Sequence, residues 1–265
     1  MVSSSFLWAI FALGATALPA PTYTFSSGAA HPAEKQVISE YFDMLGEKVQ
    51  AGRKMSHAPV CNLNTAAQPV LHPTPMPDPS TGLILKHVAI GRGTQNYTCG
   101  TNATAAPTAV GAVATLFNAS CVAATYPDLL ALLPNVALQF DLNLAASSTQ
   151  NLHPADLMMS GHHFFTNSST PFFDLNTKNW QLGQGGFAKS DALAAPTGAS
   201  VGQNGQGFGA VAWLKLAARD GATGGLSEVY RVNTAGGNPP TTCQDNLSSS
   251  FDVQYAAEYW FYEEE

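Results

Sequence analysis

Residues 253–262 read VQYAAEYWFY, and this stretch decides the fold class. In an extended chain, Val253, Tyr255 and every second residue after them fall on one face, and Gln254 and its alternates fall on the other. Strict alternation combined with aromatic residues is typical of a β-strand. We therefore expect a strand over Val253–Tyr262, followed by an acidic tail at residues 263–265.

Upstream runs share this character and are separated by Gly, Asn, Ser and Pro. They are Leu83–Ile90, Thr94–Cys99, Ala109–Phe117, Val136–Leu142, His162–Thr166, Pro171–Asp174, Gly209–Leu216 and Glu228–Asn233. Short bounded runs favour a β-sandwich or barrel of short antiparallel strands. The sequence thus predicts a mainly β domain over residues 83–262, with a short helix at Pro127–Leu133. Glycine- and glutamine-rich loops are expected over residues 183–207, around the segment Lys189–Ala195.

The segment ahead of this domain, residues 18–82, has a different pattern. Apolar residues such as Val37, Tyr41 and Leu45 recur at helical spacing and predict one amphipathic helix over Pro32–Gln50. Its charged face is mixed, which favours packing on its own domain over a membrane role. A proline-rich stretch over residues 58–82 follows, and it predicts an extended linker or a strap across the domain surface.

The first residues carry a targeting signal. The apolar run Phe6–Ala17 is too short to span a bilayer, and Ala15-Thr16-Ala17 matches a cleavage signal for secretion. We expect a signal peptide over residues 1–17, with Ala20 as the alternative cleavage point, and a secreted protein. No other apolar run is long enough for a membrane span.

Cysteines and glycosylation triplets agree with secretion. An even number of cysteines in an oxidising compartment predicts two disulfides among Cys61, Cys99, Cys121 and Cys243, and their spacing leaves three connectivities open. Triplets of the form N-x-S/T, which can carry a glycan where they are exposed, occur at Asn96, Asn102, Asn118, Asn167 and Asn246.

Composition excludes several classes of partner. A formal charge of −7 argues against nucleic-acid binding, and 45% hydrophobic residues argue against disorder. A chain of this length buries enough surface to fold alone, so we expect a monomer. The loops at Gly91–Gly93 and Gly202–Gly209 lack the strand-to-helix context of dinucleotide sites, and we expect no cofactor.

Histidines and one carboxylate are the candidates for chemistry. His162 and His163 are adjacent on an expected strand and would point to opposite faces, and Asp174 follows beyond a turn. These three residues would serve a secreted hydrolase or a metal-dependent oxidase, with the two histidines as metal ligands. The favoured alternative is that one of the two imidazoles is packed or hydrogen-bonded and the other is exposed. Trp213, Trp260 and Tyr262 could stack on sugars if they are exposed.

The motifs LKHVAIGRGTQNYTC, GHHFF, AVAWLKL, EVYRVNTAGGNPPTTC and VQYAAEYWFY, in this order, resemble a secreted family of fungi and bacteria known as domain of unknown function 3455. The residues that match the family pattern are Gly93, Gln95, Tyr97, Cys99, Gly161, His163, Arg231, Thr234, Gly236, Gly237, Pro239, Pro240, Tyr255, Ala257, Tyr259, Phe261 and Tyr262. The resemblance covers about Leu83 to Tyr262.

The resemblance implies secretion and a β-rich fold, and it implies no activity. Some fungal members are labelled malate dehydrogenase, but the glycine loops here give that label no support. Cys99 and Cys243 lie in family-like segments, so the resemblance favours Cys99–Cys243 and Cys61–Cys121 pairs. Arg231, within the R-x-x-T-x-G-G motif, is a candidate for ligand binding, or it pairs with an acid on a strand.

Taken together, these observations predict a secreted, glycosylated β protein that binds a cell-wall polysaccharide or another extracellular ligand, or that has a structural role. The alternative is the secreted hydrolase or metal-dependent oxidase that would use His162, His163 and Asp174.

Overall fold

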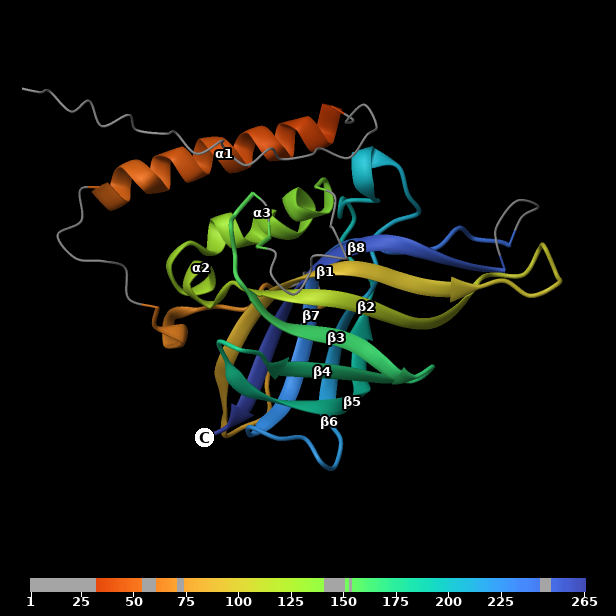
Figure 1. The fold of residues 1–265 in the computed structure, drawn as a ribbon. Helices are drawn as coiled ribbons and strands as arrows, with labels where there is room; N and C mark the ends of the chain where they lie inside the picture. Colours follow the sequence, from red (N-terminus) through yellow and green to blue (C-terminus); the bar gives the residue numbers. More distant parts are fainter. Residues whose placement is uncertain (1–31, 54–60, 71–73, 141–150, 153, 244–248) are drawn as a thin grey trace, which may run out of the picture.

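A computed structural model describes residues 32–53, 61–70, 74–140, 151–152, 154–243 and 249–265, and the expected signal peptide lies outside these ranges. Strands β1 to β8 form a closed antiparallel barrel in which each strand pairs with its sequence neighbours and β1 pairs with β8 (Figure 1). Their bounds are β1 Leu83–Thr98, β2 Thr108–Asn118, β3 Met159–Asn167, β4 Thr170–Asn176, β5 Gln181–Leu193, β6 Trp213–Ala218, β7 Leu226–Gly236 and β8 Ser250–Glu264. The mainly β prediction is confirmed, and the architecture is a barrel rather than a sandwich.

Strand β8 follows the alternation read from the sequence. Tyr255, Tyr259 and Phe261 belong to the apolar cluster inside the barrel. Trp260 and Tyr262 belong to a second cluster, between the outer face of the barrel and the segments that cover it. Both faces of β8 are therefore buried.

Glycines in β1 allow aromatic rings to cross the barrel interior. A Cβ atom on Gly91 would lie 2.4 Å from the Tyr259 ring, so only glycine fits at this position. A Cβ atom on Gly93 would lie 1.9 Å from the backbone carbonyl oxygen of Val113, so this position also requires glycine. The expected strands Leu83–Ile90 and Thr94–Cys99 are one continuous strand, because these glycines permit close packing rather than forming a turn.

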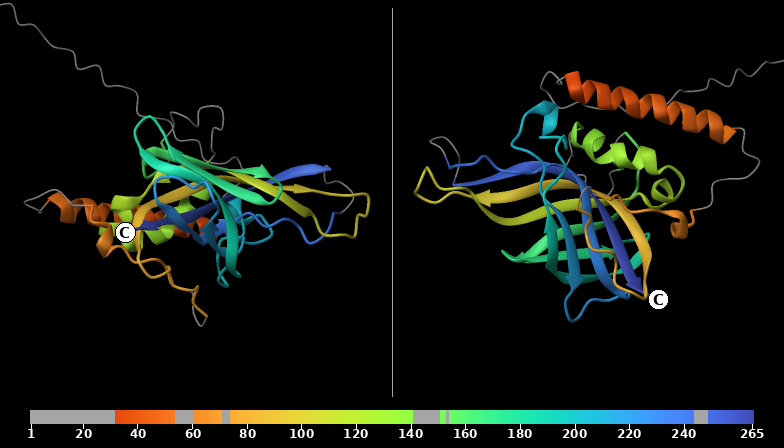
Figure 2. Two further views of the ribbon diagram at one scale, coloured as in Figure 1. Left: turned by 90° about the horizontal axis from the view of Figure 1, so that it is seen from below. Right: turned by 180° about the vertical axis from the view of Figure 1, so that it is seen from behind.

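Three α-helices of the described ranges cover one side of the barrel: α1 (Pro32–Arg53), α2 (Ser120–Thr125) and α3 (Pro127–Leu138). Helix α3 packs on β1, β7 and β8, and α1 lies across α3 on the side away from the barrel (Figures 1 and 2). The predicted N-terminal helix is confirmed, with Tyr41 buried against this layer. Within the described ranges, none of the helices has both the length and the apolar character needed to cross a bilayer.

Several predicted elements were wrong. The run expected as a strand over Val136–Leu142 begins inside α3, because Leu129, Leu133 and Val136 are buried on one helical face. The loops expected over residues 183–207 are replaced up to Leu193 by β5. Gly183 there faces a neighbouring loop so closely that a Cβ atom would lie 2.2 Å from the Thr223 carbonyl oxygen. The expected strand at Gly209–Leu216 begins at Trp213, since residues 209–212 belong to the preceding loop.

The proline-rich stretch is a strap, which we define as residues 74–82 and call the proline strap. Met76 is buried, and the Tyr230 hydroxyl of β7 donates to the Pro77 carbonyl at 2.9 Å. The Lys215 ammonium of β6 donates to the Asp78 carbonyl at 2.8 Å and forms an ion pair with Glu228 at 3.1 Å. These contacts hold the strap on the outer face of β6 and β7.

Two disulfides connect the peripheral segments to the barrel. Cys61 joins Cys121 of α2, and Cys99, just after β1, joins Cys243. This is the pairing that the family resemblance favoured. Short 3-10 turns, η1 (Leu63–Thr65) and η3 (Gln203–Gly205), complete the described elements.

Candidate functional site

His162, His163 and Asp174 do not converge. His163 is buried inside the barrel, where it stacks on Phe173 at 4.3 Å between ring centroids and lies 3.0 Å from the Phe172 carbonyl oxygen through Nδ1. Burial lowers its pKa to about 4, so the imidazole is neutral at neutral pH. His162 lies on the opposite face of β3, directly across from Asp174 of β4 in register.

Metal binding gains no support from this arrangement. In the part of the chain that the structure describes, no three His, Cys, Asp or Glu side chains gather as metal ligands. Because adjacent strand residues point to opposite faces, His162 and His163 cannot share one ion. His162 and Asp174 remain neighbours on the outer face, without a hydrogen bond between them among the described contacts.

A buried histidine–serine contact is a second arrangement that suggests chemistry. The His87 ring lies 2.9 Å from the Ser160 hydroxyl at Nε2 and 3.0 Å from the Ser120 hydroxyl at Nδ1. Both ring nitrogens are thereby occupied by hydroxyls, and burial lowers the His87 pKa to about 4. Ser160 is fully buried, so a substrate cannot reach its hydroxyl, and this contact fits a structural role.

Trp213 and Trp260 are not available for sugar stacking. Their exposed fractions are 3% and 1%, so the exposure that sugar stacking would require is not present at either tryptophan. Trp260 lies between β8 and the helical layer, where its indole donates to the Glu258 carboxylate at 2.9 Å. Both faces of β8 are buried, one inside the barrel and one under the helical layer. The period-two spacing of its aromatic residues therefore does not show which of them are exposed.

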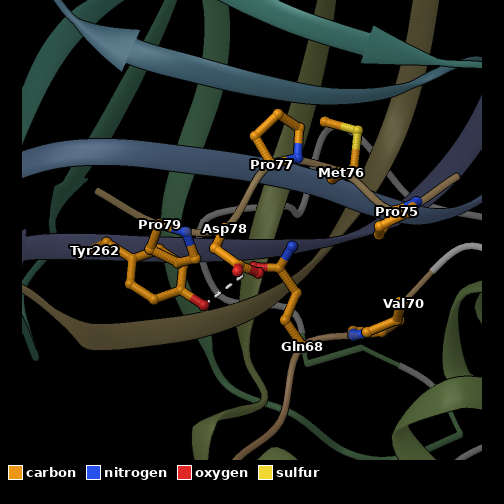
Figure 3. Close-up of a pocket in the computed structure, with 9 residues that line it drawn as sticks. Gln68, Val70, Pro75, Met76, Pro77, Asp78, Pro79 and Tyr262 are labelled. Atoms are coloured by element: carbon orange, nitrogen blue, oxygen red, sulfur yellow. Dashed lines mark hydrogen bonds between the residues drawn. The ribbon is translucent and has the colours of Figure 1, made fainter. Parts of the chain in front are cut away.

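Tyr262 lines a surface pocket of about 260 Å³ beneath the proline strap (Figure 3). Its hydroxyl donates to the Gln68 side-chain oxygen at 3.0 Å. Proline rings and Met76 supply apolar walls, and Asp78 supplies a carboxylate. The lining residues are Gln68, Pro69, Val70, Pro75, Met76, Pro77, Asp78, Pro79 and Tyr262.

Sequence reasoning identified Tyr262 but missed Gln68 and Asp78. Both lie in the proline-rich stretch, which signals an extended chain and carries no motif for chemistry. The pocket forms only because this stretch folds back across the barrel as a strap. Three contacts fix the strap there: the Tyr230 hydroxyl, the Lys215 ammonium and the Ser80 hydroxyl, which donates to Glu228 at 2.6 Å.

Arg231 lies inside the barrel. It pairs in register with Tyr259 of β8 and Leu214 of β6, and its guanidinium donates from Nη2 to the Ala212 carbonyl at 2.9 Å. The expectation that it would pair with an acid was wrong, since no ion pair of the described residues includes it. The Tyr255 and Tyr259 hydroxyls, 2.9 Å apart, lie in the same interior.

Comparison with known proteins gives a family without an assigned activity. The sequence model of a family described as "Protein of unknown function (DUF3455)" matches residues 79–263. No curated protein matches, and no solved structure matches. The matched range begins in the proline strap and covers the eight strands of the barrel except for Glu264, the last residue of β8.

Proposed function

The chain belongs to the family described as protein of unknown function (DUF3455), and because that description assigns no activity, we propose a function from its own side chains. We propose that this is an extracellular protein that binds one sugar unit of a neutral or amino polysaccharide in the pocket beneath the proline strap. The pocket at Tyr262 carries this proposal.

The size of the pocket suits a small ligand. Pockets for drug-sized molecules measure about 300–1,000 Å³, and this one, at about 260 Å³, lies just below that range. It would therefore take a single sugar unit, and the rest of a polysaccharide would remain outside. Its position on the outer face of the barrel leaves room for such a chain.

The lining chemistry also suits a sugar. Proline rings and Met76 offer an apolar surface for the C–H face of a pyranose, while Gln68, Asp78 and the Tyr262 hydroxyl offer hydrogen-bonding groups. A few placed polar groups on an apolar wall are the usual composition of a binding pocket. Among the described residues that line the pocket there is no lysine or arginine, and Asp78 is exposed. This charge favours a neutral or amino sugar and disfavours an acidic polysaccharide.

An extracellular location is supported by other features of the chain. Two disulfides are typical of an oxidising environment, and the first 17 residues have the pattern of a signal peptide. Two N-x-S/T triplets begin at exposed residues: Asn102, in the connection between β1 and β2, and Asn167, at the end of β3.

Binding to insoluble polysaccharides tests the proposal. The full chain would be mixed with chitin, chitosan, β-glucan and pectate, and the free protein measured after sedimentation. We expect retention by one of the first three materials and none by pectate. Tyr262→Phe keeps the ring and removes the hydroxyl, and Asp78→Asn removes the charge; each should weaken retention about tenfold.

Asp220→Asn is the matched control, because Asp220 is an exposed aspartate in the turn after β6, away from the pocket lining. It should bind like the unmodified protein. Retention that is unchanged in both pocket variants would place any sugar site elsewhere and contradict the proposal. Failure of the unmodified protein to bind any of the four materials would contradict it as well.

A further inference from the structure

The barrel interior holds a positive charge without a negative partner. Arg231 is 9% exposed, and the ion pairs of the described residues, Lys48–Asp128, Lys86–Glu263 and Lys215–Glu228, do not include it. A buried charge without a counter-charge is unfavourable unless other groups compensate it. The Ala212 carbonyl is one such group, but the Nε–H of Arg231 has no hydrogen-bond partner.

A second buried donor nearby is also unsatisfied. The side-chain amide nitrogen of Gln95, 8% exposed, has no hydrogen-bond partner. Gln95 is the neighbour of Tyr255, whose hydroxyl contacts that of Tyr259 at 2.9 Å. Arg231 is in turn the neighbour of Tyr259. The Arg231 guanidinium, the Gln95 amide and two phenol hydroxyls therefore share one region of the interior, where Gln95 faces Tyr255 and Arg231 faces Tyr259.

This donor set fits an oxyanion. The planar guanidinium of arginine matches the geometry of a carboxylate, and tyrosine hydroxyls and an amide N–H can complete its hydrogen bonds. Arg231 is the only cation of the set, because the nearby His163 is neutral. One positive charge is balanced by a monoanion, so a carboxylate fits better than a phosphate dianion.

The site adjoins a surface pocket through Ala212. The Ala212 carbonyl accepts from Arg231, and Ala212 is also one of the residues that line a pocket of about 410 Å³. This pocket is walled mainly by small apolar residues, among them Ala194, Ala195 and Pro196. A carboxylate on Arg231 could therefore carry an apolar group in this pocket.

We propose that Arg231, Gln95, Tyr255 and Tyr259 form a binding site for a small organic carboxylate, which reaches the barrel interior past residues 210–212. The site is separate from the pocket at Tyr262, which lies on the outer face of the barrel. This carboxylate site does not depend on the sugar-binding proposal, because the two sites share no residue.

Calorimetric titration of the full chain tests the site with four probes: sodium acetate, sodium benzoate, sodium phosphate and benzamide. Benzamide has the shape of benzoate without its charge. We expect acetate or benzoate to bind with one-to-one stoichiometry, and benzamide and phosphate to bind at least about tenfold more weakly. No binding of either carboxylate, or equal binding of benzoate and benzamide, would overturn the proposal.

Variants locate the binding. Arg231→Gln should weaken carboxylate binding about 100-fold, since a charged bidentate contact is lost. Lys178→Gln removes an exposed positive charge in the turn after β4 and should leave binding unchanged. Unchanged binding in Arg231→Gln would overturn the proposal.

Gln95→Glu gives an answer even if Arg231→Gln does not fold. It changes one buried group and places a carboxylate within the set, as an internal substitute for the ligand. We expect a higher thermal midpoint in the absence of ligand and no binding of acetate or benzoate. A variant that folds and still binds the carboxylate like the unmodified protein would count against the site.

Discussion

The Glu258 carboxylate and the Trp260 indole, which project from the same face of β8, meet in a hydrogen bond of 2.9 Å beneath α3. The other carboxylate oxygen accepts from the Asn233 amide at 2.8 Å, and that amide also donates to the Ala131 carbonyl of α3 at 2.8 Å. Glu258 is fully buried, so this contact places an ionisable group at the interface between the helical layer and the barrel.

Glu258 should make the protein less stable as the pH rises. Burial raises its pKa from 4.5 to about 7, so the folded state binds a proton that the unfolded state has released. Its contribution to the free energy of unfolding therefore falls between about pH 4.5 and pH 7, by about 3 kcal/mol. Urea unfolding of Glu258→Gln between pH 5 and pH 8 should lack this slope. The same slope in both proteins would contradict this assignment.

His163 should make the protein more stable as the pH rises from about 4 to 6.5, which is the opposite of the effect of Glu258. Its pKa of about 4 lies below the ordinary value of 6.5, so unfolding takes up a proton between these pH values. The stability that neutral His163 contributes is complete above about pH 6.5 and is lost as the pH falls toward 4, as it is for His87. His163→Phe should reduce the acid-side slope of urea unfolding. His162→Phe is the matched control at the adjacent, half-buried histidine. An equal loss of slope in both variants would argue against the assignment to His163.

Arg92 should hold α3 on the barrel. Its buried guanidinium donates to the Ala137, Leu138 and Phe140 carbonyls, at and just beyond the end of the helix. Arg92→Met would remove the charged donor that these three carbonyls share, and we expect a loss of about 2–4 kcal/mol in urea unfolding. Arg219→Met, the same change at an exposed position, should cost less than about 1 kcal/mol. If Arg92→Met lowers the free energy of unfolding by less than about 1 kcal/mol, apolar packing alone would hold α3 on the barrel.

Removal of the Cys99–Cys243 bridge should strongly destabilise the barrel. The bridge spans 144 residues of sequence, and closing a loop of that length is worth about 4–5 kcal/mol through the unfolded state. The double variant Cys99→Ser, Cys243→Ser should lose about that much in urea unfolding. The matched pair Cys61→Ser, Cys121→Ser, spanning 60 residues, should lose slightly less. A reversed order would indicate that contacts at the bridges outweigh chain entropy.

Asn102 and Asn167 should carry glycans when a eukaryotic host secretes the protein. Both are exposed, and both side-chain oxygens accept from the hydroxyl of their own triplet, Thr104 and Ser169. Asn118 is half-buried, and its oxygen accepts from the Ser120 backbone amide. Mass spectrometry before and after enzymatic deglycosylation should find modification at the first two positions and not at Asn118. Occupancy of Asn118 would require the start of α2 to open.

The strand elements were predictable where the pattern was long or bounded by clear turns. The alternation over Val253–Tyr262 identified β8 because its two faces meet different environments. The short helix expected at Pro127–Leu133 is confirmed, but it continues to Leu138. The run from Val136 was mistaken for a strand because a short apolar run suits a strand or a helix equally. Strand β5 was missed because Gly183 and Gly185 mark close approaches of a neighbouring loop, which sequence alone does not distinguish from a flexible loop.

The candidate sites were less predictable, because each depends on contacts distant in sequence. Tyr262 and Gln68 form one pocket wall although they are 194 residues apart. Arg231 was identified through a motif, but its lack of an acidic partner follows only from the closed barrel. His162 and Asp174 became register partners as β3 and β4 paired, while His163 turned inward.

The pairing of β1 with β8 sets the order of events when the chain is made. A ribosome releases β1 first and β8 after the seven other strands, so β1 waits with one unpaired edge through most of synthesis. Closure of the barrel is therefore completed only after translation of residues 250–264. Until that moment the exposed edges of β1 and β7 can pair with other chains, which makes the nascent protein a substrate for chaperones.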